Sequence, residues 1–307
     1  EIVLCDWSSD VCSSDLENTR AEKELDRIRH VDICDAQTGP IFLAYRDNAA
    51  ITAIVNKIKT QDVEYDFTSP DGIRHRVWVI GEAGDIAAIR KAFADIDQLY
   101  IADGHHRAAS AVKVGEKRRN EHPGYTGKEE FNFFLSVLFP ESELKILDYN
   151  RVVKDLNGMT EDAFLQKIKE IFEVSELIAK DKHPQEKGTF SMYLKERWYT
   201  CKVRPEDQSE DPVKGLDVSL LQNLMLTPVL GITDPKTDPR IDFVGGIRGT
   251  KELEKRCHED AKAAFAMYPT SIGELFAVAD AGLLMPPKST WFEPKLRSGL
   301  FIHLLNE

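Results

Sequence analysis

The sequence of this 307-residue chain predicts two β-hairpins among its strands and helices, and these hairpins limit the fold classes that the chain can adopt. The first joins strands at 63–67 and 75–80 through Ser69-Pro70-Asp71-Gly72, where proline presets one dihedral and glycine accepts positive φ. The second joins strands at 189–194 and 198–203. Hairpins mixed irregularly with helices favour an α+β fold over a doubly wound parallel sheet.

The other elements are predicted from apolar periodicity and turn chemistry. Short apolar strands are expected at 41–45, 99–102, 131–139, 144–149 and 243–244. Helices are expected at 17–30, after Asn48, and at 85–93, 105–118, 161–171, 216–226, 251–263 and 272–279. The polar stretch 119–129 is typical of a surface loop or boundary. We therefore expect a core at 17–122 and a second α+β region at 123–307.

The first sixteen residues need separate treatment. Asp6–Leu16 reads DWSSDVCSSDL, which resembles the translation of a common sequencing-library adapter. The segment lacks the basic and apolar regions of a signal peptide. We interpret residues 1–16 as non-native and expect the natural protein to extend upstream of Glu17.

Composition excludes several classes of function. Lys and Arg total 40 against 52 for Asp and Glu, a net charge of −12, and leaving out residues 1–16 removes four acids and no base to give −8. An acidic chain without a basic stripe is not expected to bind DNA or RNA. No window approaches the ~18 apolar residues of a membrane span. The sequence does not indicate an oligomeric state.

Cysteine usage indicates the compartment. Outside residues 1–16 the thiols are Cys34, Cys201 and Cys257, with no C-x-x-C spacing. This pattern is neither a disulfide framework nor a zinc site, so we expect buried thiols and a cytoplasmic protein.

The residues richest in chemistry are Asp103-Gly104-His105-His106-Arg107, between the apolar strand at 99–102 and a helix. A strand, a glycine turn and a helix start direct backbone N–H groups and the positive end of the helix dipole at one point, which favours an anion. Arg107 can hold a phosphate by two hydrogen bonds, and Asp103 can hold Mg²⁺. The alternative is structural: Asp103 caps the helix, and the His and Arg side chains are solvated.

A second polar segment lies near the C-terminus. Pro286 and Pro287 stiffen the chain, and Lys288, Ser289 and Thr290 follow with an ammonium and two hydroxyls. This combination can close over phosphate oxygens, although a proline-rich exit from the preceding helix is the structural alternative. The glycine-rich run 245–249 lacks the spacing of a nucleotide-binding loop, so a turn is expected there, with Arg248 a possible phosphate contact.

These two segments carry a resemblance. IADGHHRAASAVKVGEKR is similar to the signature of the ParB/sulfiredoxin superfamily, in its branch of free-serine kinases and uncharacterised bacterial proteins. MPPKSTWF, with Pro294-Lys295 and Ser298-Gly299-Leu300, resembles the C-terminal signature of the uncharacterised set. The resemblance to this uncharacterised set extends to the N-terminal part of the chain, at Thr19-Arg20, Asp26-Arg27 and Gly39-Pro40.

The resemblance implies a role for each matching residue. The loop would bind nucleotide phosphates through Gly104, His105, His106 and Arg107, with Asp103 ordering Mg²⁺, and His105 would act with Asp103 in catalysis. Lys288, Ser289 and Thr290 would contact the nucleotide from another side, in one cleft with the loop. Glu17 matches the catalytic glutamate of the kinases, although a solvated helix-start acid is an equal reading.

These roles predict a nucleotide-dependent phosphotransferase, with ATP or ADP as donor, Mg²⁺ as metal and a small hydroxylated metabolite such as free L-serine as acceptor. The alternatives are a non-catalytic nucleotide-binding switch, as in the ParB branch, and a nucleotide-binding interaction protein. Sulfiredoxin chemistry is disfavoured, because its reactive cysteine sits where this chain has His105.

Overall fold

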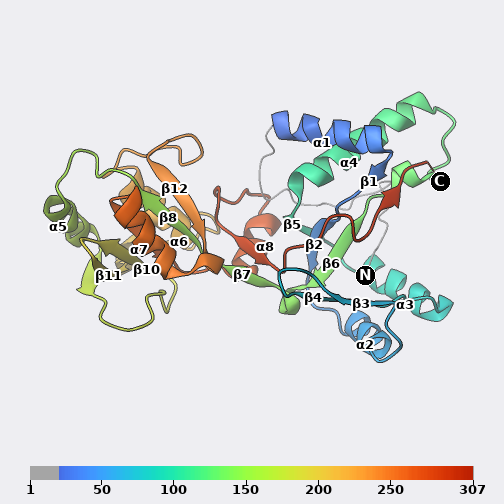
Figure 1. Cartoon of the computed structure of the whole chain (residues 1–307), viewed down its shortest axis with the longest axis horizontal. Helices are drawn as coiled ribbons and strands as arrows, with labels where there is room; N and C mark the ends of the chain where they lie inside the picture. The colour runs from blue at the N-terminus through green and yellow to red at the C-terminus, as the bar shows by residue number, and fades with distance from the viewer. Residues whose placement is uncertain (1–20, 307) are drawn as a thin grey trace. The chain divides into compact units, whose positions relative to one another are not determined.

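The computed structural model describes residues 21–306, so the expectations for residues 1–16 and for Glu17 lie outside the described residues. The chain divides into two compact units (Figure 1). Unit 1 comprises Glu24–Glu143 with the C-terminal segment from Arg297, and unit 2 comprises Leu144–Leu296. Both combine helices with small mixed or antiparallel sheets, which confirms the α+β class.

Unit 1 is built on a three-stranded sheet in the order β5-β2-β6, with β2 antiparallel to β5 and parallel to β6. Its elements follow the predicted pattern closely. They are α1 (Ala21–Cys34), β1 (Ala36–Gln37), β2 (Ile41–Tyr45), α2 (Ala49–Ile58), β3 (Tyr65–Thr68), β4 (Arg74–Val77), α3 (Ala83–Ala94), β5 (Tyr100–Asp103), α4 (His105–Glu121), the 3₁₀ turn Glu130–Asn132, β6 (Ser136–Pro140) and β15 (His303–Leu304).

Every residue of β2 is buried, and its alternate residues Ile41, Leu43 and Tyr45 belong to one apolar cluster. Ile51 of α2 and residues of α3 and α4 pack against them. Asn48 begins α2 as expected, since its side-chain oxygen accepts hydrogen bonds from the first-turn N–H groups of that helix. Burial of this face fixes β2 and β5, and therefore the start of α4.

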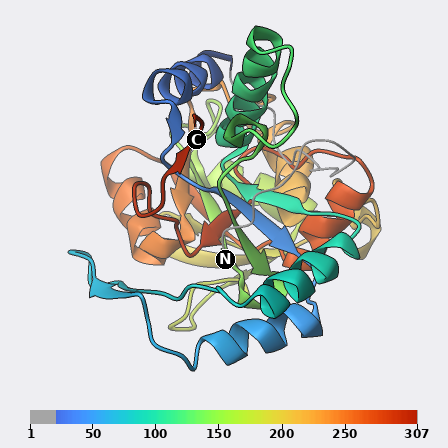
Figure 2. The same cartoon turned by 90° about the vertical axis from the view of Figure 1, so that its right-hand side faces the viewer.

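Helices α1 and α4 lie side by side in both views (Figures 1 and 2). Val31 of α1, Val114 of α4 and Leu305 of the C-terminal segment share a small apolar cluster. Ion pairs join the same two helices, among them Lys117 with Asp32 at 2.6 Å. The C-terminal segment then pairs with β1 through β15, so it lies beside the strand that follows α1.

Unit 2 contains a six-stranded antiparallel sheet in the order β12-β8-β13-β10-β11-β9 and a small ladder of β7 with β14. Its elements are β7 (Lys145–Leu147), β8 (Tyr149–Val153), α5 (Glu161–Ile171), β9 (Glu173–Glu176), β10 (Thr189–Leu194), β11 (Arg197–Lys202), α6 (Asp217–Leu221) with a π-helical continuation (Gln222–Leu226), β12 (Ile241–Gly245), α7 (Thr250–Glu259), β13 (Ala263–Met267), α8 (Ile272–Asp280) and β14 (Trp291–Glu293).

Alternation along the strands of unit 2 separates two apolar faces. Val152, Val244 and Ala264 face one way and pack with Leu253 of α7. On the other face, Phe190 makes edge-to-face ring contacts with its neighbours. The sheet is therefore covered on both sides, which makes its central strands almost wholly apolar.

The structure corrects three sequence expectations. The helix expected to reach residue 263 ends at Glu259, and Ala263–Met267 forms the central strand β13, with all five residues buried. The strand expected at 131–139 begins only at Ser136, after a 3₁₀ turn. The strand expected at 144–149 is two strands, β7 and β8, and β8 continues to Val153. Tertiary packing overrides the helix propensity of the alanines in β13.

Among residues 21–306, no helix is both long and apolar enough to cross a bilayer.

Candidate anion site of unit 1 and the Lys288 loop of unit 2

The predicted strand, turn and helix are present at Asp103–Arg107. β5 ends at Asp103, Gly104 has φ +92°, and α4 begins at His105. A Cβ on Gly104 would lie 2.9 Å from Nε of Arg107, so glycine serves both the left-handed conformation and the close approach of the arginine. The Asp103 carboxylate accepts a hydrogen bond from the Gly104 N–H at 2.8 Å, and no side chain caps α4. The positive end of α4 is therefore left to a ligand or solvent.

The guanidinium of Arg107 folds back over this turn towards Gly39. A Cβ on Gly39 would lie 3.3 Å from its Nη1 atom and 3.0 Å from Oγ of Ser298. Burial lowers the pKa of Arg107, the charge of Asp103 opposes this, and the nearby Arg27 lowers it further. Among the described residues, the Arg107 guanidinium makes no hydrogen bond and no ion pair. Its planar set of donors is therefore available to an anion.

Arg107 lines a cavity of about 50 Å³ within unit 1. This volume is room for several water molecules or one tetrahedral oxyanion. No carboxylate lines it among the described residues, whereas two guanidinium groups and several hydroxyls do. The lining residues are Arg27, His30, Val31, Gln37, Thr38, Gly39, Ile41, Arg107, Ser110 and Ser298. Cations and hydroxyls without a carboxylate are suited to an anionic ligand.

The C-terminal segment completes this cavity. The Gly299 N–H donates to the Thr38 carbonyl at 2.7 Å, and the Leu305 N–H donates to the Asp35 carbonyl at 3.0 Å. These bonds bring Ser298, from the tail of the second sequence signature, beside Arg107 from the first. Within unit 1, two motifs nearly two hundred residues apart thus meet at one cavity.

The histidines and Asp103 are the other expected members of the loop. Asp103, His105 and His106 are all half-buried, and Nε2 of His105 and Nδ1 of His106 are buried atoms. Among residues 21–306, no three His, Cys, Asp or Glu side chains gather in a cage that could hold a metal. Asp103 is therefore not part of a preformed metal cage of described residues.

The segment predicted from Lys288 to Thr290 belongs to unit 2. Lys288 has φ +57°, a left-handed conformation rare outside glycine, and its side chain is exposed. Ser289 is only 3% exposed, and its hydroxyl donates to the Pro286 carbonyl at 2.5 Å. The Ser289 hydroxyl therefore already serves the loop, which leaves the Lys288 ammonium as its most available group.

The glycine pair at 245–246 is explained by packing. A Cβ on Gly245 would lie 2.5 Å from the Trp291 ring, and one on Gly246 would overlap the Asp148 carboxylate. Arg248 is exposed and lies 3.6 Å from Glu252. A turn is thus supported for this run, with two close approaches that sequence spacing did not reveal.

The remaining cysteines match the expected packing role in two of three cases. Cys201 is buried and Cys257 is partly buried, and burial raises the pKa of both thiols, that of Cys257 to about 12. Cys34 is exposed, contrary to expectation. A thiol with a raised pKa is a poor nucleophile at neutral pH.

Sequence reasoning missed several residues of both sites. Arg27 and Ser298 stood in the quoted motifs without a role, and His30 carried no signal. In unit 2, Arg151 of β8 was missed, because the predicted strand ended at Tyr149 and left residues 150–153 unassigned. The signal that could have found it was a charged residue directly before two apolar ones, Val152 and Val153, which the structure shows to be buried.

A family model described as a protein of unknown function, DUF1015, matches residues 14–219, more than half of the sequence. The chain belongs to this family. No curated protein matches it.

Three solved structures are similar to this member of the family at low identity. One is SbnI with a C-terminal truncation from Staphylococcus aureus, at 12% identity and a TM-score of 0.49, covering 99% of this chain and 87% of that one. Another is a free serine kinase in complex with AMP, at 15% identity and a TM-score of 0.44, covering 97% and 90%. The third is a conserved hypothetical protein from Pyrococcus furiosus, at 17% identity and a TM-score of 0.40, covering 97% and 94%.

Proposed function

We propose that this protein is a nucleotide-dependent phosphotransferase of the ParB/sulfiredoxin superfamily, acting on a small hydroxylated metabolite. The observation that carries the proposal is the Arg107 guanidinium, desolvated and without a protein partner among the described residues, in a cavity that also contains Arg27. A desolvated guanidinium beside a helix start, with no hydrogen bond to a described residue and only the nearby charge of Asp103 to offset its own, is suited to a phosphate group, which accepts two parallel hydrogen bonds from it. ATP or ADP is the donor that this chemistry fits.

Each residue of the loop has a part in this proposal. Gly104 lets a phosphate approach the backbone closely, and Arg107 binds its oxygens. His105 and His106 supply further donors, whose charge can change near neutral pH. Asp103 would hold Mg²⁺, which when bound neutralises phosphate charge.

The transfer itself needs groups beyond the loop. The acceptor oxygen forms a bond to the terminal phosphorus while the bond from that phosphorus to the leaving phosphate oxygen breaks. The acceptor's proton passes to a base, for which we propose Glu17, and Lys288 offsets the charge that develops on the phosphate oxygens. Free L-serine is the acceptor to test first, because the DGHHR motif resembles that of the free-serine kinases.

A non-catalytic nucleotide switch is the second candidate. One observation favours it: among the described residues, no carboxylate lines the cavity of Arg107, so a base for the acceptor hydroxyl is missing from that lining. Both candidates require nucleotide binding and differ only in turnover.

Two measurements on one preparation separate the candidates. Calorimetric titration with ATP, ADP and CTP measures binding, and mass spectrometry after incubation with ATP or ADP, Mg²⁺ and L-serine measures phosphoserine. The phosphotransferase proposal expects binding and product. Binding without product from serine or a panel of hydroxylated metabolites favours the switch, and the absence of binding refutes both.

A further inference from the structure

Arg151 is a buried cation without an acidic partner. It lies in β8 opposite Phe243 of β12, is 4% exposed, and has its guanidinium carbon 5.5 Å from the centre of the Phe243 ring. Burial lowers its pKa to about 9, so it stays protonated at neutral pH. Among the described residues, no carboxylate pairs with it. Burying an unpaired charge costs stability, which indicates that Arg151 has a specific structural or functional role.

The hydrogen bonds of Arg151 connect the sheet to the Lys288 loop. Its two terminal nitrogens donate to the carbonyls of Tyr149 and Lys288, the latter at 3.1 Å. The loop is fixed at two further points, because Ser289 donates to Pro286 and the Thr270 hydroxyl donates to the Ser289 carbonyl at 3.4 Å. These hydrogen bonds to backbone carbonyls stabilise Lys288 in its left-handed conformation.

This arrangement displays the Lys288 side chain. Its ammonium lies 5.7 Å from the centre of the Tyr149 ring, a cation–π distance, and it forms no ion pair with any described residue. Tyr149 belongs to the same strand as Arg151. One strand thus fixes the loop through its arginine and orients the ammonium through its tyrosine.

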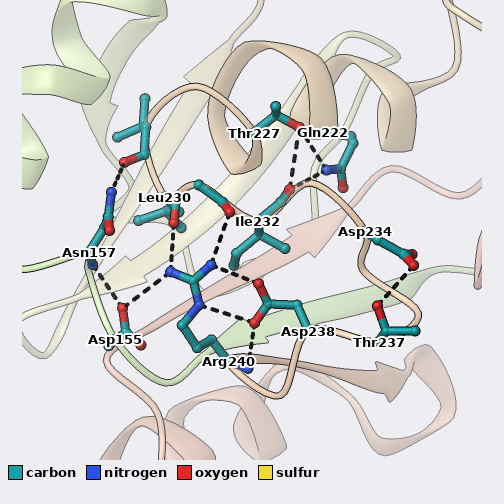
Figure 3. Close-up of polar contacts among 12 residues, drawn as sticks. Asp155, Asn157, Gln222, Thr227, Leu230, Ile232, Asp234, Thr237, Asp238 and Arg240 are labelled. Atoms are coloured by element: carbon teal, nitrogen blue, oxygen red, sulfur yellow. Dashed lines mark hydrogen bonds and ion pairs between the residues drawn. The ribbon is translucent and has the colours of Figure 1, made fainter.

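Arg240 offers a comparison within the same unit (Figure 3). It also holds a loop, by donating to the carbonyls of Leu230 and Gly231 at 2.8 and 3.0 Å. Its charge, however, is neutralised by Asp238 at 2.7 Å, with Asp155 at 3.9 Å. Holding a loop therefore does not require an uncompensated arginine. Arg151, by contrast, donates to the Lys288 carbonyl without an ion pair to any described carboxylate.

We propose that Arg151 is a positioning residue, which fixes the Lys288 loop through its backbone so that the ammonium can bind phosphate oxygens. The proposal rests on the function proposed above, since it takes the phosphate from the bound nucleotide. Arg151 itself does not touch the ligand and acts through the Lys288 carbonyl.

The test is a double-mutant cycle on ADP affinity, measured by calorimetry. Lys288→Ala should weaken ADP binding roughly 10- to 100-fold, the value of one charge-assisted contact. Arg151→Lys keeps the charge but removes the planar pair of donors. It should weaken ADP binding several-fold when Lys288 is present. In a protein that already carries Lys288→Ala, it should cause no further loss of affinity. Arg240→Lys, the matched control, should leave the affinity unchanged.

Trypsin cleavage after Lys288 provides a readout that needs no ligand. A loop held by Arg151 should be cut slowly in the unaltered protein and Arg240→Lys, and several-fold faster in Arg151→Lys. Arg151→Met should increase cleavage further if it folds, and Arg151→Lys keeps the test available if it does not.

The outcomes separate the two proposals. If the unaltered protein binds no nucleotide, the proposed function fails, and the phosphate role of Lys288 fails with it. If ADP binds but Arg151→Lys weakens it equally with and without Lys288, or cleavage after Lys288 does not change, only the positioning role is overturned. Non-additive affinities together with faster cleavage support it.

Discussion

Replacing Arg107 by methionine should separate the stability of the free protein from its affinity for nucleotide. The guanidinium is desolvated, has no hydrogen-bond partner among the described residues, and is repelled by Arg27, with Asp103 as the opposing attraction. Methionine fills similar space without a charge to desolvate. We therefore expect Arg107→Met to leave the unliganded protein as stable as before, or more stable by up to about 1 kcal/mol.

The effect on binding has the opposite sign. A charge-assisted hydrogen bond contributes about 1.5–3 kcal/mol, so losing even one of the hydrogen bonds from Arg107 to phosphate should raise the Kd for ADP by about 10- to 100-fold. At an ADP concentration 100 times the original Kd, ligand binding stabilises the unaltered protein by about 2.7 kcal/mol. At 100-fold weaker affinity the same concentration gives only ~0.4 kcal/mol.

Thermal unfolding with and without ADP measures both effects. For a chain of this size, 1 kcal/mol corresponds to a Tm change of about 1.5–2 °C, so ADP should raise the Tm of the unaltered protein by roughly 4–5 °C and that of Arg107→Met by less than about 1 °C. Arg29→Met, on the exposed side of α1, is the matched control and should keep the full ADP shift. A variant that loses several degrees without ligand, yet keeps the ADP shift, would show that Arg107 is structural.

Three further predictions test neighbouring features. Asp103→Asn should abolish any increase in nucleotide affinity caused by Mg²⁺ and leave metal-free binding unchanged. Titrations with and without Mg²⁺ measure this, and an unchanged Mg²⁺ effect would contradict the metal role. Gly104→Ala should lower the free energy of unfolding by about 1–2 kcal/mol in a urea melt, because φ is +92° and the new Cβ contacts Arg107. The variant should also bind ADP more weakly. An unchanged free energy of unfolding would contradict the expected backbone strain. Burial raises the pKa of Asp217 to about 7, so the folded state binds its proton more tightly than the unfolded state, and stability should fall as pH rises from about 4 to 7 by at most about 1.4 kcal/mol per unit from this group. Asp217→Asn should flatten that slope, measured by urea melts across the pH range, and a slope that persists would assign it to other groups.

The sequence predicted the parts of the fold that local chemistry determines. Asn48 caps its helix, the Ser69–Gly72 turn closes its hairpin, and residues 161–171 form the helix expected there. β13 was missed because its alanines favour a helix when considered alone, and only burial on both faces makes them a strand. Pairings between distant segments, such as β1 with β15, have no local signal at all.

The candidate site shows the same division. The strand, the Gly104 turn and the helix start were predictable, because each is a local feature with a known geometry. The lining of the cavity was not, since Ser298 reaches Arg107 only through tertiary contacts of the C-terminal segment. The contact of Arg151 could not be predicted either, because its hydrogen bond to the Lys288 carbonyl joins residues 137 apart in the sequence.

A crystal structure of the protein with ADP and Mg²⁺ tests the central claim most directly. We predict a phosphate group in the cavity of unit 1, with two of its oxygens about 2.7–2.9 Å from the guanidinium nitrogens of Arg107. The nucleotide phosphates should lie at the start of α4, beside Gly104. ADP bound at another place, with the Arg107 cavity holding only water, would contradict it.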